Sequence, residues 1–111
     1  MGYKFKIEKN QKKYIFVLYP NNSNIQPIGE SCDYDSISEC SKALSQFRKI
    51  IKQTNTEYSI CIDEFPENKF LPYLVYRGEK IFSRTLKYTV SKKECDKWLN
   101  RIIRNIDAEL K

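Results

Sequence analysis

The chain has 111 residues, of which 41% are hydrophobic and 31% charged, and its formal net charge is +6 with no histidine. This length suits one ordinary domain or two small units that share a core. The lack of histidine excludes Ser-His-Asp and Cys-His catalytic arrangements. With no stretch of the roughly 18–20 apolar residues that cross a bilayer and no signal-peptide pattern, we expect a cytoplasmic protein with no membrane partner.

The first half of the chain is predicted to form three strands and a helix. Alternating residues predict a strand over 3–7, an aromatic-rich run predicts a second over 14–19, and a third ends at Tyr34. Ser36 and Glu39 stand in the S-x-x-E relation of a capping box, which marks the start of a helix. Apolar residues then recur three and four positions apart and predict a helical stripe facing a core, namely Cys40, Ala43, Leu44, Phe47, Ile50 and Ile51.

The second half of the chain follows the same order. Strands are predicted over 58–62 and 70–76, and a third ends at Tyr88. Ser91 and Glu94 form a second capping box. The helical stripe that follows consists of Cys95, Trp98, Leu99, Ile102, Ile103 and Ile106.

The two halves have similar sequences: SISECSKAL at 36–44 resembles SKKECDKWL at 91–99. A three-stranded unit with one helix buries too little surface to be stable alone, so the two units should share a core. The sequence therefore predicts an α+β fold of two tandem β-β-β-α repeats with pseudo-twofold symmetry, in which antiparallel sheet strands pack against two helices. Residues 1–55 form repeat one and residues 56–111 form repeat two of a single compact domain, 1–111.

This order of elements resembles the YegP-like family of small bacterial domains, which occur singly or as tandem repeats and have no known function. The residues that carry the resemblance are YKFKIEKNQKKYIFVLY (3–19), DYDSISECSKAL (33–44) and the segment from YSICIDEF to KKECDKWL (58–99). The resemblance covers nearly the whole chain and implies the tandem α+β fold. It implies no activity and no catalytic residues.

No catalytic, cofactor or metal site is predicted. The cysteines form no C-x-x-C pair, and a zinc site would require all four to converge, so reduced core thiols are the better prediction. Cys61 differs from the others, because it falls on the strand face opposite Ile60 and Ile62. Acidic residues in turns are usually solvated, which is the expectation for Asp33, Asp35, Asp63, Glu64 and Glu67.

A non-enzymatic module for protein–protein interaction, adaptor-like or inhibitor-like, is the favoured functional prediction. The strands over 14–19 and 70–76 are apolar on both faces, so one face is either covered internally or available to a partner. A phenylalanine in an otherwise charged turn is a further candidate. The predicted protein contacts are Phe65, Tyr73 and Tyr76, and the expected state is a monomer or weak homodimer.

The alternative prediction is single-stranded nucleic-acid binding, for which basic side chains beside aromatic strands are suited. The same charges also fit an ordinary solvated surface. The predicted nucleic-acid contacts are Arg84, Lys87, Lys93, Lys97, Arg101 and Arg104.

Overall fold

The computed structural model describes residues 3–20, 27–53, 57–84 and 89–111. These residues form, in chain order, β1 (Tyr3–Asn10), β2 (Lys13–Pro20), β3 (Gly29–Ser31), α1 (Ile37–Lys52), β4 (Tyr58–Phe65), β5 (Lys69–Tyr76), β6 (Glu79–Ser83), α2 (Lys92–Arg104) and β7 (Glu109–Leu110). Neither helix in this part of the chain is long and apolar enough to cross a membrane. The predicted α+β fold, with two helices and a mostly antiparallel sheet, is confirmed.

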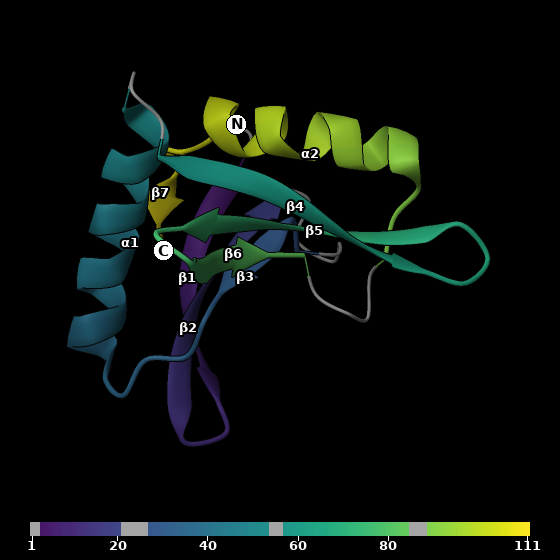
Figure 1. Cartoon of the computed structure of the whole chain (residues 1–111). Helices are drawn as coiled ribbons and strands as arrows, with labels where there is room; N and C mark the ends of the chain where they lie inside the picture. The colour runs from purple at the N-terminus through teal and green to yellow at the C-terminus, as the bar shows by residue number, and fades with distance from the viewer. Residues whose placement is uncertain (1–2, 21–26, 54–56, 85–88) are drawn as a thin grey trace.

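The strands form one sheet in the order β4-β5-β6-β3-β2-β1-β7, drawn in Figure 1. Every neighbouring pair is antiparallel except β1 and β7, which are parallel. The short strands β3 and β6 meet in the middle, with Glu30 opposite Ser83 and Ser31 opposite Phe82. The long hairpins β1–β2 and β4–β5 therefore lie on either side of this central pair.

Both helices begin at the predicted capping serines. The Ser36 hydroxyl accepts a hydrogen bond from the backbone N–H of Glu39 at 3.1 Å, and Ser91 accepts one from Glu94 at 3.3 Å. The predicted apolar stripe of α1 faces the core. In α2, Ile103 departs from its predicted place, because its side chain is 41% exposed. The buried residues of α2 are Cys95, Trp98 and Ile102. One step along a helix turns a side chain by about 100°, so Ile103 points away from the face that Ile102 buries.

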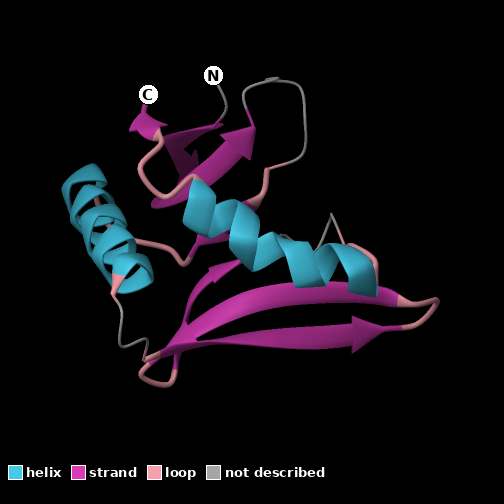
Figure 2. Cartoon of the chain, turned by 90° about the horizontal axis from the view of Figure 1, so that it is seen from above, coloured by secondary structure: helices cyan, strands magenta, loops and turns pink. Residues whose placement is uncertain are grey.

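The two helices pack on one apolar core, although they run in different directions (Figures 1 and 2). Phe82 of β6 lies within this core. Its ring centroid lies close to those of Phe47 in α1 (4.7 Å), Phe16 in β2 (5.9 Å) and Trp98 in α2 (6.2 Å). The indole N–H of Trp98 donates to the backbone oxygen of Ile28 at 2.7 Å. Side chains from both halves of the sequence therefore share this core.

The third strand of the first half ends earlier than predicted, since the sequence predicts an end at Tyr34. β3 stops at Ser31, and Tyr34 follows it as an isolated bridge to Tyr14. The predicted end of the other third strand, Tyr88, lies outside the described residues. β7 has no counterpart among the predicted strands.

Candidate protein-binding surface

The two outer ends of the sheet differ in how their edges are covered. At one end, β7 pairs with β1, so that Lys4 lies opposite Glu109 and Phe5 lies opposite Leu110. The backbone N–H of Lys111 also donates to the oxygen of Phe5 at 2.9 Å. The chain's own C-terminal segment thus covers this edge of β1.

β4 forms the other end of the sheet, and no described segment pairs with its outer edge. All eight of its residues pair with β5 without a break in register, so the outer edge is long and regular. The first five residues, 58–62, carry no charge, and the charged residues of the strand begin at Asp63. Unpaired N–H and C=O groups attract another strand, and natural edges are usually protected by lysine, proline, a bulge or a covering segment. The first part of β4 has no such protection.

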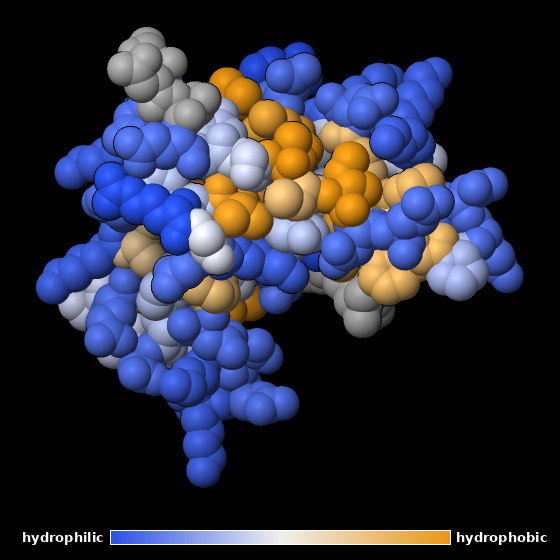
Figure 3. Space-filling model, viewed as in Figure 1, coloured by the Kyte–Doolittle hydropathy of each residue, from blue (hydrophilic) through white to orange (hydrophobic). Residues whose placement is uncertain are grey.

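Exposed isoleucines flank this edge on the face that carries α2. Ile60 and Ile62 of β4 are 39% and 36% exposed, and Ile103 of α2 is 41% exposed. Figure 3 shows hydrophobic side chains gathered in a band where β4 runs beside α2 in Figure 1. We call Ile60 and Ile62 of β4 the isoleucine strip. The predicted half-buried strand is therefore more open than expected, because α2 packs mainly over β5 and makes few contacts with β4.

The opposite face of the β4–β5 hairpin carries two of the three predicted protein contacts. Phe65 is the last residue of β4 and does not lie in a turn as predicted. Both Phe65 and Tyr73 are half-buried, and Tyr73 lies opposite Cys61 in the strand register. The Lys80 ammonium lies 4.5 Å from the centroid of the Tyr73 ring. The negative charge of Asp63 raises the pKa of the Tyr73 hydroxyl. This face is therefore more polar than the face with the isoleucine strip.

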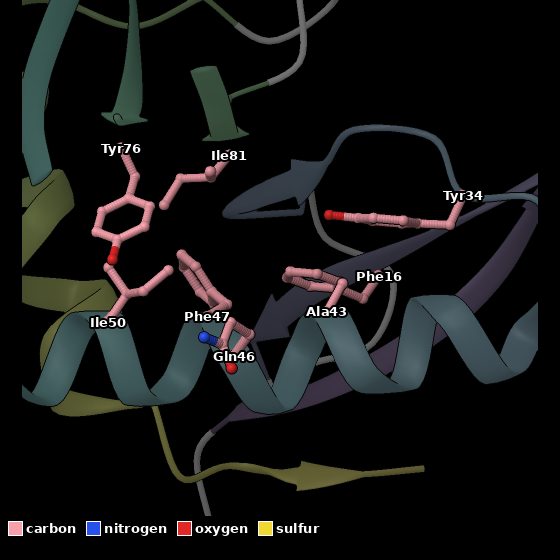
Figure 4. Close-up of a pocket in the computed structure, with 8 residues that line it drawn as sticks. All are labelled: Phe16, Tyr34, Ala43, Gln46, Phe47, Ile50, Tyr76 and Ile81. Carbon is pink, nitrogen blue, oxygen red and sulfur yellow. The ribbon is translucent and has the colours of Figure 1, made fainter. Parts of the chain in front are cut away.

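The third predicted contact, Tyr76, lines a pocket between α1 and the sheet (Figure 4). The pocket has a volume of about 190 Å³, and its walls are mostly aromatic and aliphatic: Phe16, Tyr34, Ala43, Gln46, Phe47, Ile50, Tyr76 and Ile81. Burial raises the pKa of Tyr34, and its hydroxyl accepts a hydrogen bond from the Cys32 thiol at 3.4 Å. None of the described lining residues is a carboxylate or an amine, so the lining supplies no acid–base pair.

The structure corrects one predicted nucleic-acid contact. Arg84 is only 7% exposed, so its guanidinium lies inside the protein and is not available to a phosphate on the surface. Burial and the positive charge of Arg101 lower the pKa of Arg84. Lys87, another predicted contact, lies outside the described residues.

The remaining four predicted nucleic-acid contacts lie in one row along α2. Lys93, Lys97 and Arg104 are exposed, whereas Arg101 is half-buried. Its Nε and Nη2 donate to the Tyr3 hydroxyl at 3.3 and 3.2 Å. Three exposed cations therefore remain on this face of the helix.

The four cysteines differ in burial, whereas the candidate carboxylates are all exposed. Cys40 and Cys95 are buried, as expected of core thiols, whereas Cys32 is exposed and Cys61 is half-buried. Within the described ranges, no three histidine, cysteine, aspartate or glutamate side chains gather as metal ligands would. The carboxylates predicted to be solvated are all exposed: Asp33, Asp35, Asp63, Glu64 and Glu67. Asp63 and Glu64, however, lie in β4 and not in the predicted turn.

No family model matches the sequence, and no curated protein matches it. Two solved structures are similar over the whole chain. One is YegP from E. coli, a protein of unknown function, with a TM-score of 0.74 and 19% identity over 100% of this chain and 92% of that one. The other is a UPF0339 protein from Shewanella oneidensis, with a TM-score of 0.74 and 16% identity over 100% of this chain and 91% of that one. The chain thus has the fold of these two proteins, as its resemblance to the YegP-like family implied.

Proposed function

We propose that the chain is a non-enzymatic protein-binding module whose β4 edge accepts an extended strand from a partner protein. The observation that carries this proposal is the uncharged open edge of β4 beside the isoleucine strip. In strand addition, backbone hydrogen bonds supply affinity, and pockets or apolar contacts for alternate side chains supply specificity. β4 offers both components, since Ile60 and Ile62 project from the same face of the edge strand.

The covered end of the sheet supports this proposal. There β7 adds to the edge of β1, which means that the chain already uses strand addition on itself. We also propose a reducing, cytoplasmic location, because all four cysteines are free thiols.

We further propose that the domain arose from the two repeats 1–55 and 56–111. The same kind of backbone bridge precedes each helix. Tyr14 pairs with Tyr34 before α1, and Phe70 pairs with Val90 before α2, each through two backbone hydrogen bonds. The third strands β3 and β6 are neighbours in the sheet. A single domain of two repeats is consistent with the core that they share.

The alternative function is single-stranded nucleic-acid binding, and the observation that favours it is the row of exposed Lys93, Lys97 and Arg104 on α2. Phosphate contacts release counterions, so such binding weakens log-linearly with salt. If this alternative holds, Lys93→Glu with Lys97→Glu should abolish the binding of random single-stranded oligonucleotides in fluorescence anisotropy. Binding that is absent even at low salt would remove the alternative.

The proposed function is tested by comparing the proteins that immobilised variants retain from a cell lysate. The test variant is Ile60→Glu/Ile62→Glu, which places charges on the open edge. The matched control is Ile37→Glu, because Ile37 is a 57% exposed isoleucine at the start of α1. We expect the test variant to lose partners that the wild type and the control retain. A retained set that is the same for all three proteins would refute the binding of another protein at this edge.

A further inference from the structure

The β4 edge is complementary to itself, and we infer that the strand it accepts is β4 of a second copy, antiparallel and with Cys61 facing Cys61. This inference rests on the proposed function, because it names the partner of the same edge. The pairing would join two sheets into one continuous sheet around a twofold axis, which is the commonest symmetry of soluble oligomers.

The register with Cys61 on the axis places complementary residues opposite one another. Ile60 then lies opposite Ile62 of the second copy, and by symmetry this apolar pair occurs twice. On the same axis, Ser59 faces Asp63 and Tyr58 faces Glu64, so each acidic residue meets a hydroxyl that can donate a hydrogen bond.

Neighbouring registers are worse on charge or on apolar contact. An axis at Ile60 places Asp63 opposite Glu57, and an axis at Asp63 places that residue opposite itself. Like charges directly opposite one another destabilise a pair of strands. An axis at Ile62 places Ile60 opposite Glu64 and so loses an apolar pair. The Cys61 register is the one that pairs every isoleucine and no like charges.

The helices leave room for this pairing. Each α2 packs over its own β5, and two β5 strands would be separated by three strand spacings, or about 14 Å. Packed helices approach to about 8–10 Å, so the two α2 helices would not collide. The isoleucine strips of the two copies would meet between them and bury the exposed side chains.

The first test measures the mass of the protein by sedimentation velocity over a range of concentrations. We expect a reversible dimer in the wild type and in Ile37→Glu, and a monomer in Ile60→Glu/Ile62→Glu. Circular dichroism checks that each variant is folded. A wild type that stays monomeric at every concentration, or a dimer that survives in the β4 variant, would overturn the inference.

The second test adds one positive charge to β4 at either of two positions. Ser59→Lys places an ammonium opposite Asp63 of the second copy, whereas Cys61→Lys places two ammonium groups opposite each other on the axis. Opposite-charge pairs contribute about 0.2–1 kcal/mol each, so two of them should tighten the dimer about two- to thirty-fold. Cys61→Lys should weaken it, while Cys61→Ser should leave it nearly unchanged. Equal weakening by both lysines would overturn this register.

The third test keeps the edge residues and uses Cys61 as the reporter. In a Cys32→Ser variant, which removes the exposed thiol, diamide should join two Cys61 thiols. Two protons and two electrons pass to diamide as one S–S bond forms between the copies. Residues directly opposite in antiparallel strands have Cα atoms about 4.5–5.5 Å apart, which suits a disulfide. Failure to form this covalent dimer would overturn the register even if the variants of the first test do not fold.

The outcomes for the inference and for the proposed function can be distinguished. If the protein is monomeric but Ile60→Glu/Ile62→Glu still loses partners from the lysate, the second copy is the wrong partner and the protein-binding function stands. If Ile60→Glu/Ile62→Glu changes neither the mass in sedimentation nor the set of retained proteins, both the inference and the proposed function are wrong.

Discussion

Replacement of Gly29 by alanine tests how rigid the shared core is. A methyl group at Gly29 of β3 would lie 2.5 Å from Cε2 of Phe82 and 3.0 Å from the backbone oxygen of Ser83. The ring of Phe82 has little room to move aside, because its centroid lies 4.7 Å from that of Phe47 and 5.9 Å from that of Phe16. The Ser83 oxygen belongs to the neighbouring strand β6 and is fixed by the sheet. Gly29→Ala must therefore displace packed atoms.

The expected loss in the free energy of unfolding is about 1–3 kcal/mol, which is the usual cost of an extra methylene in a well-packed core. In a domain of about 100 residues, each kcal/mol lowers the melting temperature by about 4–8 °C. Phe82→Leu alone leaves a gap beside Gly29, and the added methyl group fills part of that gap. The double variant should therefore be more stable than the two single losses predict, by about 1 kcal/mol.

The assay is urea unfolding, followed by the fluorescence of the single tryptophan, Trp98, and by far-ultraviolet circular dichroism. The control is Gly78→Ala, because Gly78 has φ +83° and no heavy atom within 4 Å of an added Cβ. Its loss should come from backbone strain and should add simply to that of Phe82→Leu. If Gly29→Ala leaves the free energy of unfolding unchanged, or if its loss simply adds to that of Phe82→Leu, this reasoning is refuted. If the two probes gave separate transitions, the predicted single domain would be wrong.

Two further predictions concern buried polar groups. Trp98→Phe removes the N–H that donates to the Ile28 oxygen at 2.7 Å. It should lower the free energy of unfolding by about 1–3 kcal/mol, measured by urea unfolding with circular dichroism. An unchanged unfolding midpoint would contradict this role of the hydrogen bond. Burial raises the pKa of the Cys40 thiol from 9.0 to about 11. Between pH 9 and 11 the thiol therefore stays protonated in the folded state and ionises in the unfolded state. Because the folded state then binds more protons, the free energy of unfolding should fall as pH rises through this range. Unfolding midpoints of wild type and Cys40→Ala, measured across this range, check the effect; an equal fall in both proteins would show that Cys40 does not cause it.

The local elements could be predicted from the sequence because their signals are short-range. The Ser36 and Ser91 caps depend on residues three positions away, and both are formed. The stripe along α1 depends on a spacing that any amphipathic helix shares. The α+β class follows from these signals, since alternating strands and two amphipathic helices leave few ways to build one core.

The contacts between distant elements could not be predicted in the same way. Nothing near Arg84 in the sequence indicates that its side chain is buried, because the burial comes from the packing of elements far apart in the chain. Ile103 looks like a core residue by spacing alone, yet its side chain is 41% exposed. β7 has only two residues, and Arg48 of α1 helps to fix the turn before it by donating to the backbone oxygens of Ile106 and Ala108 at 3.0 and 2.6 Å. These features depend on the arrangement of the sheet, which local patterns do not encode.

Loss of the strand that covers β1 tests whether charged side chains protect an exposed edge of this sheet. Deletion of residues 109–111 would expose the edge of β1, but that strand carries Lys4 and Lys6, and edge lysines oppose the addition of another strand. We therefore expect the deletion to lower stability modestly and to leave the mass in sedimentation unchanged. Made in the Ile60→Glu/Ile62→Glu background, the deletion should remain monomeric. New association in that background would show that charge does not protect an edge of this sheet, and the inference drawn from the uncharged part of β4 would lose its basis.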